Sequence, residues 1–91
     1  MKILLIEDNP NDAFFIQYMS SGNEFTHCLD LKSALRYLET KSVDLDLIML
    51  DLDLPDSQGE QTLDRILACT KLPVVILTSY ILSKVTTKAI R

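Results

Sequence analysis

The stretch that most constrains the fold of this chain is LDLIMLDLDLPDSQG, at residues 45–59. Its apolar run, residues 47–50, is short and ends at Asp51, which is typical of a strand buried within a parallel sheet. Pro55 and Gly59 then predict a loop, because both residue types interrupt regular structure. Asp51 is therefore expected at the carboxyl end of a buried strand, where open α/β sheets bind their ligands.

Two other apolar runs end in polar side chains in the same way. The N-terminal run leads into Glu7 and Asp8, and a later run leads into Thr78. The carboxyl ends of parallel strands meet at one edge of a sheet, so neighbouring strands would bring these side chains to Asp51.

This set of residues indicates a site for a cation and a phosphoryl group. Hard carboxylate oxygens suit Mg²⁺, which can also bridge to a phosphoryl oxygen. An aspartate such as Asp51 can attack phosphorus and form an acyl phosphate, while Thr78 could donate a hydrogen bond to a phosphoryl oxygen. A single acidic residue at a strand end is often only a helix cap or a solvated loop residue. Four other aspartates are interpreted in that way: Asp12, Asp44, Asp46 and Asp56.

The rest of the chain predicts strands that alternate with helices, in an α/β fold. Four strands are expected, at residues 2–6, 25–29, 47–51 and 74–77, the second of them at a sheet edge. Four helices are expected, at residues 10–21, from 31 to about 41, from near 59 to the break at Pro73, and 83–90. The expected core positions of the first three helices are Phe15, Ile16, Met19, Leu31, Ala34, Leu35, Leu38, Leu63, Ile66 and Leu67. This alternation predicts a parallel sheet with right-handed crossovers and helices on both faces.

The composition excludes several classes of protein. With 91 residues, 47% hydrophobic and 24% charged, the chain has the size and balance of one globular domain. Its net charge of −4 argues against binding of nucleic acid or an anionic membrane by this segment. No apolar run reaches the length of a membrane span or signal peptide, so we expect a cytoplasmic protein. Cys28 and Cys69 are expected to be reduced core thiols, and His27 a strand or surface residue without a metal.

Three motifs together resemble a known family: ILLIEDNPND at residues 3–12, LIMLDLDLPDSQG at 47–59 and LPVVILTS at 72–79. They are similar to the CheY-like receiver domain of bacterial two-component response regulators, and the likeness runs over residues 1–91. The resemblance implies a signalling domain rather than an enzyme, with a flavodoxin-like fold and strand order 2-1-3-4-5.

The resemblance also implies a role for each site residue. Asp51 would accept a phosphoryl group from a sensor histidine kinase or a phosphotransfer protein. Mg²⁺ would be bound by the side chains of Asp8 and Asp51, by the backbone carbonyl of Asp53 and, through water, by Glu7. Thr78 would be the switch hydroxyl that moves toward the phosphoryl group and biases the segment after it.

The chain departs from the family pattern at its C-terminal end. The fifth strand, with its site lysine, and the fifth helix would follow Arg91, so the domain is expected to be incomplete before its fifth βα unit. The strand that leads into Thr78 would then be a bare sheet edge. Three apolar side chains would lose cover: Ile6, Phe15 and Met19. Either the chain is part of a longer protein, or the bare edge pairs with another copy in a homodimer.

Two other functions remain open from the sequence. Asp51 and Asp53 resemble the nucleophile and the acid of phosphatases of the haloacid dehalogenase type. Against that hypothesis, the acceptor strand is third rather than first in the chain, and Leu54 lacks the expected hydroxyl. The missing lysine also permits a receiver-like interaction domain that is not phosphorylated.

Overall fold

The computed structural model describes residues 1–41, 44–77 and 88–89. They form a five-stranded sheet in the order β2 (Glu24–Cys28), β1 (Lys2–Ile6), β3 (Leu47–Asp51), β6 (Val74–Leu77) and β7 (Lys88–Ala89). A small antiparallel hairpin joins β4 (Asp53–Leu54) to β5 (Ser57–Gln58). Three helices complete the described part: α1 (Pro10–Met19), α2 (Leu31–Lys41) and α3 (Glu60–Cys69). No helix in this part is long and apolar enough to span a membrane.

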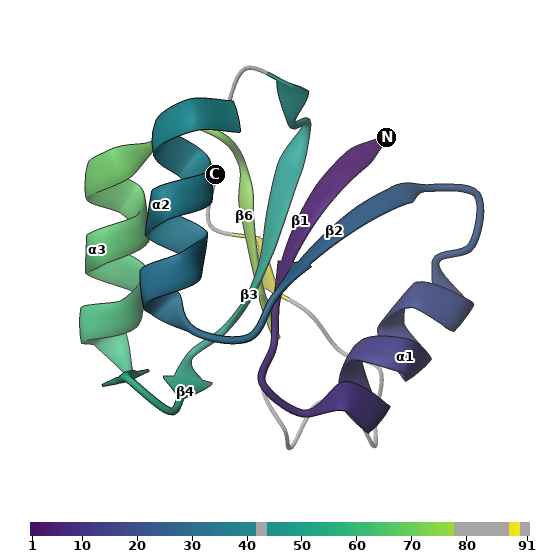
Figure 1. The fold of residues 1–91 in the computed structure, drawn as a ribbon, viewed down its shortest axis with the longest axis horizontal. Coiled ribbons are helices and arrows are strands. Elements are labelled where there is room, and N and C mark those ends of the chain that lie inside the picture. Colours follow the sequence, from purple (N-terminus) through teal and green to yellow (C-terminus); the bar gives the residue numbers. More distant parts are fainter. Residues whose placement is uncertain (42–43, 78–87, 90–91) are drawn as a thin grey trace.

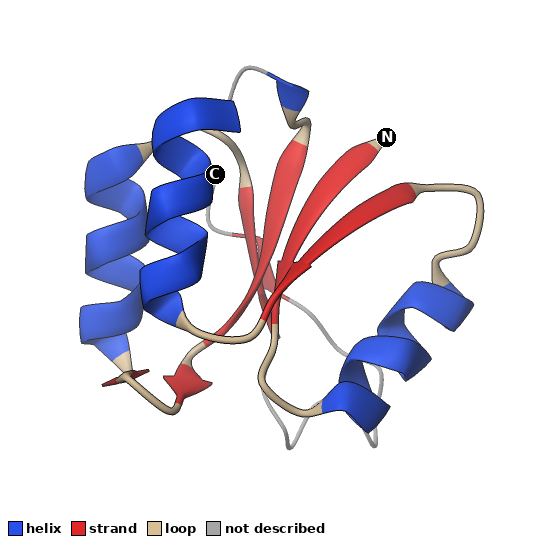
Figure 2. Ribbon diagram, viewed as in Figure 1, coloured by secondary structure: helices blue, strands red, loops and turns tan. Residues whose placement is uncertain are grey.

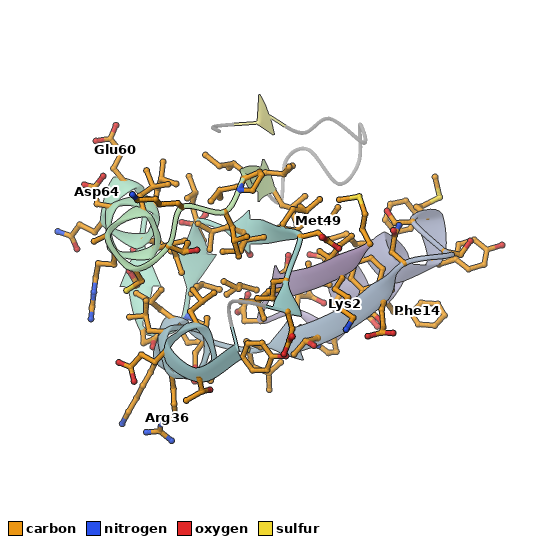
Figure 3. All side chains as sticks on the ribbon, turned by 90° about the horizontal axis from the view of Figure 1, so that it is seen from above. Lys2, Phe14, Arg36, Met49, Glu60 and Asp64 are labelled. Atoms are coloured by element: carbon orange, nitrogen blue, oxygen red, sulfur yellow. The ribbon has the colours of Figure 1, made fainter. Side chains whose placement is uncertain are left out.

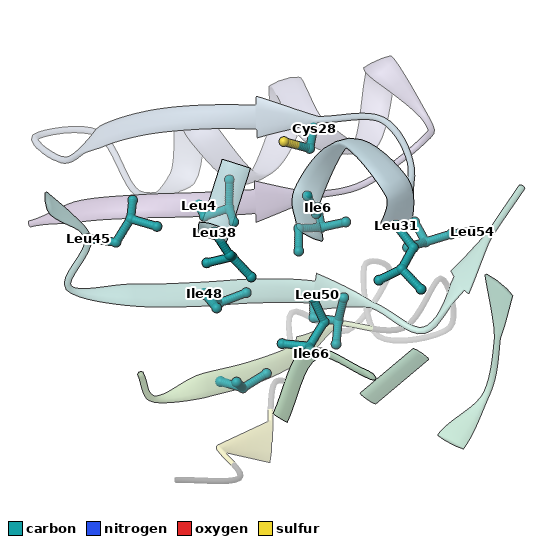
Figure 4. Close-up of a cluster of buried hydrophobic side chains, with 12 residues drawn as sticks. Leu4, Ile6, Cys28, Leu31, Leu38, Leu45, Ile48, Leu50, Leu54 and Ile66 are labelled. Carbon is teal, nitrogen blue, oxygen red and sulfur yellow. The ribbon is translucent and has the colours of Figure 1, made fainter. Parts of the chain in front are cut away.

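The helices cover both faces of the sheet, with α1 on one face and α2 and α3 on the other (Figure 1, Figure 2). Because side chains alternate along a strand, β1 contributes to two cores. Leu4 and Ile6 pack in the core between the sheet and the α2–α3 layer (Figure 4), whereas Leu5 packs with Ala13 and Ile16 of α1. The central strands are therefore apolar on both faces, as parallel strands of this class are.

The strand register determines which residues meet at the carboxyl edge of the sheet. β1 pairs in parallel with β3, and Ile6 lies opposite Leu50. Glu7 and Asp51 therefore follow two paired residues on adjacent strands. β3 pairs in parallel with β6, and Asp51 itself lies opposite Leu77. The predicted α/β class and the parallel pairing of the four predicted strands are confirmed. These strands lie in the order β2-β1-β3-β6, which agrees with the first four positions of the order 2-1-3-4-5 that the resemblance implied.

Local chemistry explains why α1 begins just beyond this edge. The Oδ1 of Asn9 accepts hydrogen bonds from the backbone N–H groups of Asn11 (2.8 Å) and Asp12 (3.2 Å). Pro10 occupies the first helical turn. Proline is tolerated there because a backbone N–H at that position would have no partner within the helix. The helix ends at Met19, two residues before the predicted end, and the chain then turns through Gly22 at a φ of 98°.

Of the helix predicted at residues 83–90, the structure describes only residues 88 and 89, and there the prediction is wrong. Lys88 and Ala89 form β7, which pairs antiparallel with Ile76 and Val75 of β6. The predicted bare edge is thus paired at these positions, because an unpaired strand edge leaves backbone N–H and C=O groups that another strand can satisfy. Thr78 lies outside the described residues.

Three predicted core positions are also wrong. Phe15 is 37% exposed and Met19 is 55% exposed, and Cys69 is exposed as well, although Cys28 is buried. At about 100° per residue, Phe15 lies roughly 200° around the helix from Ala13, which faces the sheet. Met19, four residues after Phe15, shares that outer face. The neighbouring ring of Phe14 also projects away from the sheet (Figure 3).

Candidate metal centre

Three carboxyl groups from two adjacent strands meet at the carboxyl edge of the sheet. Glu7 and Asp8 directly follow β1, and Asp51 is the last residue of β3. One oxygen atom from each of the three lies within 4.8 Å of the others. Glu7 is 2% exposed and Asp51 is 6% exposed, whereas Asp8 is open to solvent. The cluster therefore offers a buried pair of carboxyls with an accessible third carboxylate.

Backbone contacts hold the Glu7 end of the cluster. The Glu7 N–H donates to the carbonyl oxygen of Cys28 (3.0 Å), and its Oε2 accepts from the N–H of Asn9 (3.1 Å). The Nε2 of His27 lies 2.6 Å from the carbonyl oxygen of Glu7. His27 is thus a strand residue, as predicted, and it supports the end of β1 from the neighbouring strand.

The segment after Asp51 is fixed by hydrogen bonds of its own. The Oδ1 of Asp51 accepts from the N–H of Asp53 (2.9 Å). The carbonyl oxygen of Leu52 accepts from the N–H of Gly59 (3.0 Å) and from the hydroxyl of the buried Thr62 on α3 (3.0 Å). The predicted loop after Asp51 is therefore an ordered turn, and it orients the Asp51 carboxylate.

Burial and mutual repulsion change the acidity of the two buried carboxyls. Burial raises the pKa of Glu7 to about 8; the N–H of Asn9 offsets part of this rise, and the hydrogen bond and charge of Asp51 add to it. Burial also raises the pKa of Asp51, against the opposing effects of the Asp53 N–H and the hydrogen bond from Glu7, while the charges of Asp8 and Asp53 raise it further. Without a cation, Glu7 therefore tends to keep a proton near neutral pH and to donate it in a hydrogen bond to Asp51.

The raised pKa of Glu7 predicts how the stability of the metal-free protein depends on pH. In the folded state Glu7 holds a proton that it releases above about pH 4.5 in the unfolded chain, so the contribution of Glu7 to the stability is greatest below that pH and is lost as the pH rises to about 8. The slope should reach at most about 1.4 kcal/mol per pH unit. Urea unfolding of the wild type and Glu7→Gln across this range measures it. We expect the variant to have a flatter profile; equal slopes would contradict the assignment.

Comparison with known proteins identifies the family to which this arrangement belongs. The family model of the response regulator receiver domain matches residues 3–91. This chain belongs to that family. A receiver domain is the part of a response regulator that operates in two-component signalling, and the sequence resemblance is thereby confirmed. A search of curated proteins gave no match.

Solved receiver domains share the fold. The bacteriophytochrome response regulator AtBRR is 32% identical, with a TM-score of 0.70 over 86% of this chain and 66% of its own. The signal receiver domain of a putative Luxo repressor protein from Vibrio parahaemolyticus is 32% identical, with a TM-score of 0.67 over 85% of this chain and 60% of its own. The N-terminal domain of a response regulator/sensory box/GGDEF 3-domain protein from Carboxydothermus hydrogenoformans is 30% identical, with a TM-score of 0.73 over 87% of this chain and 65% of its own. The receiver chain therefore spans 60 to 66% of the length of these structures.

The receiver structure brings together three of the five residues predicted for the site. Glu7, Asp8 and Asp51 form the cluster. Asp53 lies beside it, with its N–H hydrogen-bonded to Asp51 and its side chain exposed, and its predicted role as a ligand through the backbone carbonyl stays a prediction. The fifth, Thr78, is not among the described residues. Sequence reasoning missed the supporting contact of His27, because a bond to the backbone of another strand leaves no local pattern.

Sequence reasoning also missed one contact of an aspartate in the turn after Asp51. Asp56 was interpreted as a cap or loop residue, and it does cap a helix, but that helix is α2, 24 and 25 residues away in the chain. No signal in the sequence could have identified the helix, because the partners are backbone groups of a distant segment.

Proposed function

We propose that this receiver domain accepts a phosphoryl group on Asp51 from a histidine kinase or a phosphotransfer protein, in the cytoplasm. The observation that carries the proposal is the meeting of Glu7, Asp8 and Asp51 within 4.8 Å at the ends of two adjacent parallel strands. Carboxyl groups held so close repel one another, and such repulsion favours a site that binds a cation.

The donor set fits Mg²⁺. Its atoms are hard oxygens, with one exposed carboxylate that leaves room for coordinated water. Asp8 and Asp51 would bind the ion through their side chains, Asp53 through its backbone carbonyl and Glu7 through water. When bound, Mg²⁺ would supply positive charge that stabilises the charge developing on the phosphoryl oxygens.

The side chain of Asp51 is the nucleophile in this proposal. The N–H of Asp53 holds its Oδ1 at 2.9 Å, and the hydrogen bond from Glu7 favours the ionised form of Asp51. A bond forms between a carboxylate oxygen of Asp51 and phosphorus as the bond from phosphorus to the imidazole nitrogen of the donor breaks. The electron pair stays on that nitrogen, which takes up a proton from water.

Thr78 is the proposed switch hydroxyl. The register supports this role, because Leu77 lies opposite Asp51 on the adjacent strand and Thr78 is the next residue in the chain. Movement of the hydroxyl toward the phosphoryl group would bias the segment that follows. A homodimer through the edge of β6 is not part of the proposal, since β7 pairs with that edge.

Labelling with a small phosphodonor tests the proposal. Wild type, Asp51→Asn and Asp44→Asn are incubated with acetyl phosphate, with and without Mg²⁺, and their intact masses are measured. Asp44 is an exposed aspartate before β3 and serves as the matched control. We expect one phosphoryl group per chain on wild type and Asp44→Asn, only with Mg²⁺, and none on Asp51→Asn. Labelling of Asp51→Asn at the wild-type rate, or no labelling of wild type, would overturn the proposal.

Repeated turnover of an aryl phosphate would instead support the phosphatase hypothesis.

A further inference from the structure

Two carboxylates from different parts of the chain cap the N-terminus of α2. The first backbone N–H groups of any helix have no partner within it. Asp30, just before the helix, accepts from the N–H of Ser33 (2.8 Å) and from its hydroxyl (2.6 Å). Asp56 accepts from the N–H of Leu31 (2.8 Å) with Oδ1 and from that of Lys32 (2.9 Å) with Oδ2. Asp30 is a local cap, whereas Asp56 belongs to the turn that starts at Asp51.

Hydrogen bonds and packing make this turn a stiff connection from Asp51 to Asp56. Asp53 donates its N–H to Asp51 and, with Leu54, pairs in the β4–β5 hairpin. Leu54 is buried in the same hydrophobic core as Leu31, the first residue of α2. These contacts form a continuous connection through which a displacement at Asp51 would reach Asp56.

We propose that Asp56 is a positioning residue that couples the state of Asp51 to the N-terminus of α2. The inference rests on the proposed function, because phosphorylation is the change of state. Conversion of the Asp51 carboxylate into an acyl phosphate removes the charged acceptor of the Asp53 N–H and weakens that hydrogen bond. The turn then shifts, and the hydrogen bonds that the N–H groups of Leu31 and Lys32 donate to Asp56 weaken. Coupling free energies are reciprocal, so loss of the Asp56 contact would also change the stability of the phosphorylated state of Asp51 relative to the free state. We expect the rate at which Asp51 is labelled to change with it.

The coupling would give the chain an output surface at α2. Asp56 lines a groove of about 490 Å³ between α2 and α3, together with Lys32, Arg36 and Arg65. Movement of its carboxylate would change both the shape and the charge of this groove. The phosphorylation state of Asp51 would thus be exposed on a face formed by α2 and α3.

The two caps supply a matched pair of variants. Asp56→Asn and Asp30→Asn each remove one charged acceptor from the same helix end, but only Asp56 lies on the turn after Asp51. For wild type and both variants, the rate of Asp51 labelling by acetyl phosphate with Mg²⁺ is measured by intact mass. Amide hydrogen exchange at Leu31 and Lys32 is measured by NMR before and after labelling.

We expect both variants to exchange faster at the start of α2, because each loses a cap. Only Asp56→Asn should change the labelling rate, by about fivefold or more, while Asp30→Asn labels like wild type. In wild type and Asp30→Asn, labelling should speed exchange at Leu31 and Lys32 by a similar factor. In Asp56→Asn it should add nothing.

The outcomes separate this inference from the proposed function. If wild type is labelled but the two variants have equal labelling rates, or labelling leaves exchange at Leu31 and Lys32 unchanged, the coupling is overturned and the proposed function stands. If wild type takes no label, both are overturned. The wild-type exchange measurement needs no variant, so unchanged exchange at Leu31 and Lys32 would overturn the coupling even if Asp56→Asn fails to fold.

Discussion

Replacement of Asp8 by alanine is expected to lower the rate of Mg²⁺-dependent labelling of Asp51 by on the order of 100-fold. Asp8 is the exposed member of the carboxyl cluster, so it is the one through which a hydrated ion would first be bound. Without it, the charge that develops on the phosphoryl oxygens would be poorly compensated. The labelling rate with acetyl phosphate, measured over a range of Mg²⁺ concentrations, gives both the rate and the apparent affinity for the ion.

Asp12→Ala is the control for this prediction. Asp12 lies in the first turn of α1, and its negative charge contributes to the raised pKa of Glu7, but it is not a member of the cluster. Its removal takes the same charge from the region without taking a ligand. If the two variants slowed labelling equally, the effect would be one of overall charge, and Asp8 would not be a metal ligand.

Replacement of Leu50 by alanine is expected to reduce the free energy of unfolding by about 3 kcal/mol. Leu50 is fully buried on the central strand β3, in the core covered by α2 and α3 (Figure 4). Truncation would leave a cavity between the sheet and the helices. A domain of this size has a total stability of roughly 5–15 kcal/mol, so the loss is a large share of it. Urea unfolding followed by circular dichroism measures the change.

Leu29→Ala makes the same chemical change on the surface. Leu29 is 55% exposed, just after β2, and its truncation should alter the stability by less than about 0.5 kcal/mol. Similar losses for the two variants would show that the core is not where the structure places it.

The strands and the cluster could be predicted from the sequence because both depend on local patterns. A short apolar run that ends in an acidic residue identifies a buried parallel strand and its carboxyl end, as for β1 and β3. The topology of such sheets then brings Glu7, Asp8 and Asp51 together without any knowledge of side-chain contacts. Capping residues and apolar spacing likewise predicted the three described helices. The bounds of α2 agree with the prediction, whereas α1 ends two residues early and α3 ends at Cys69, before the expected break at Pro73.

The wrong or missed predictions concern segments whose local sequence pattern is ambiguous, or residues whose contacts lie far away in the chain. Helix α1 carries apolar side chains on both sides, so the pattern identified Ile16 as a core position but did not show that Ala13, rather than Phe15 and Met19, packs with it against the sheet. The pairing of β7 with β6 depends on the free edge of β6, not on the short β7 sequence. The contact between Asp56 and α2 likewise depends on how two loops meet.

A titration of the metal-free protein with Mg²⁺, followed by amide NMR, tests most directly whether the ends of β1 and β3 form one cation site. We expect the amide signals of Glu7, Asp8, Asp51 and Asp53 to shift together with a single midpoint, and these shifts to be lost in Asp51→Ala. Shifts with separate midpoints for the two strands, or no shift at these residues, would contradict the shared site.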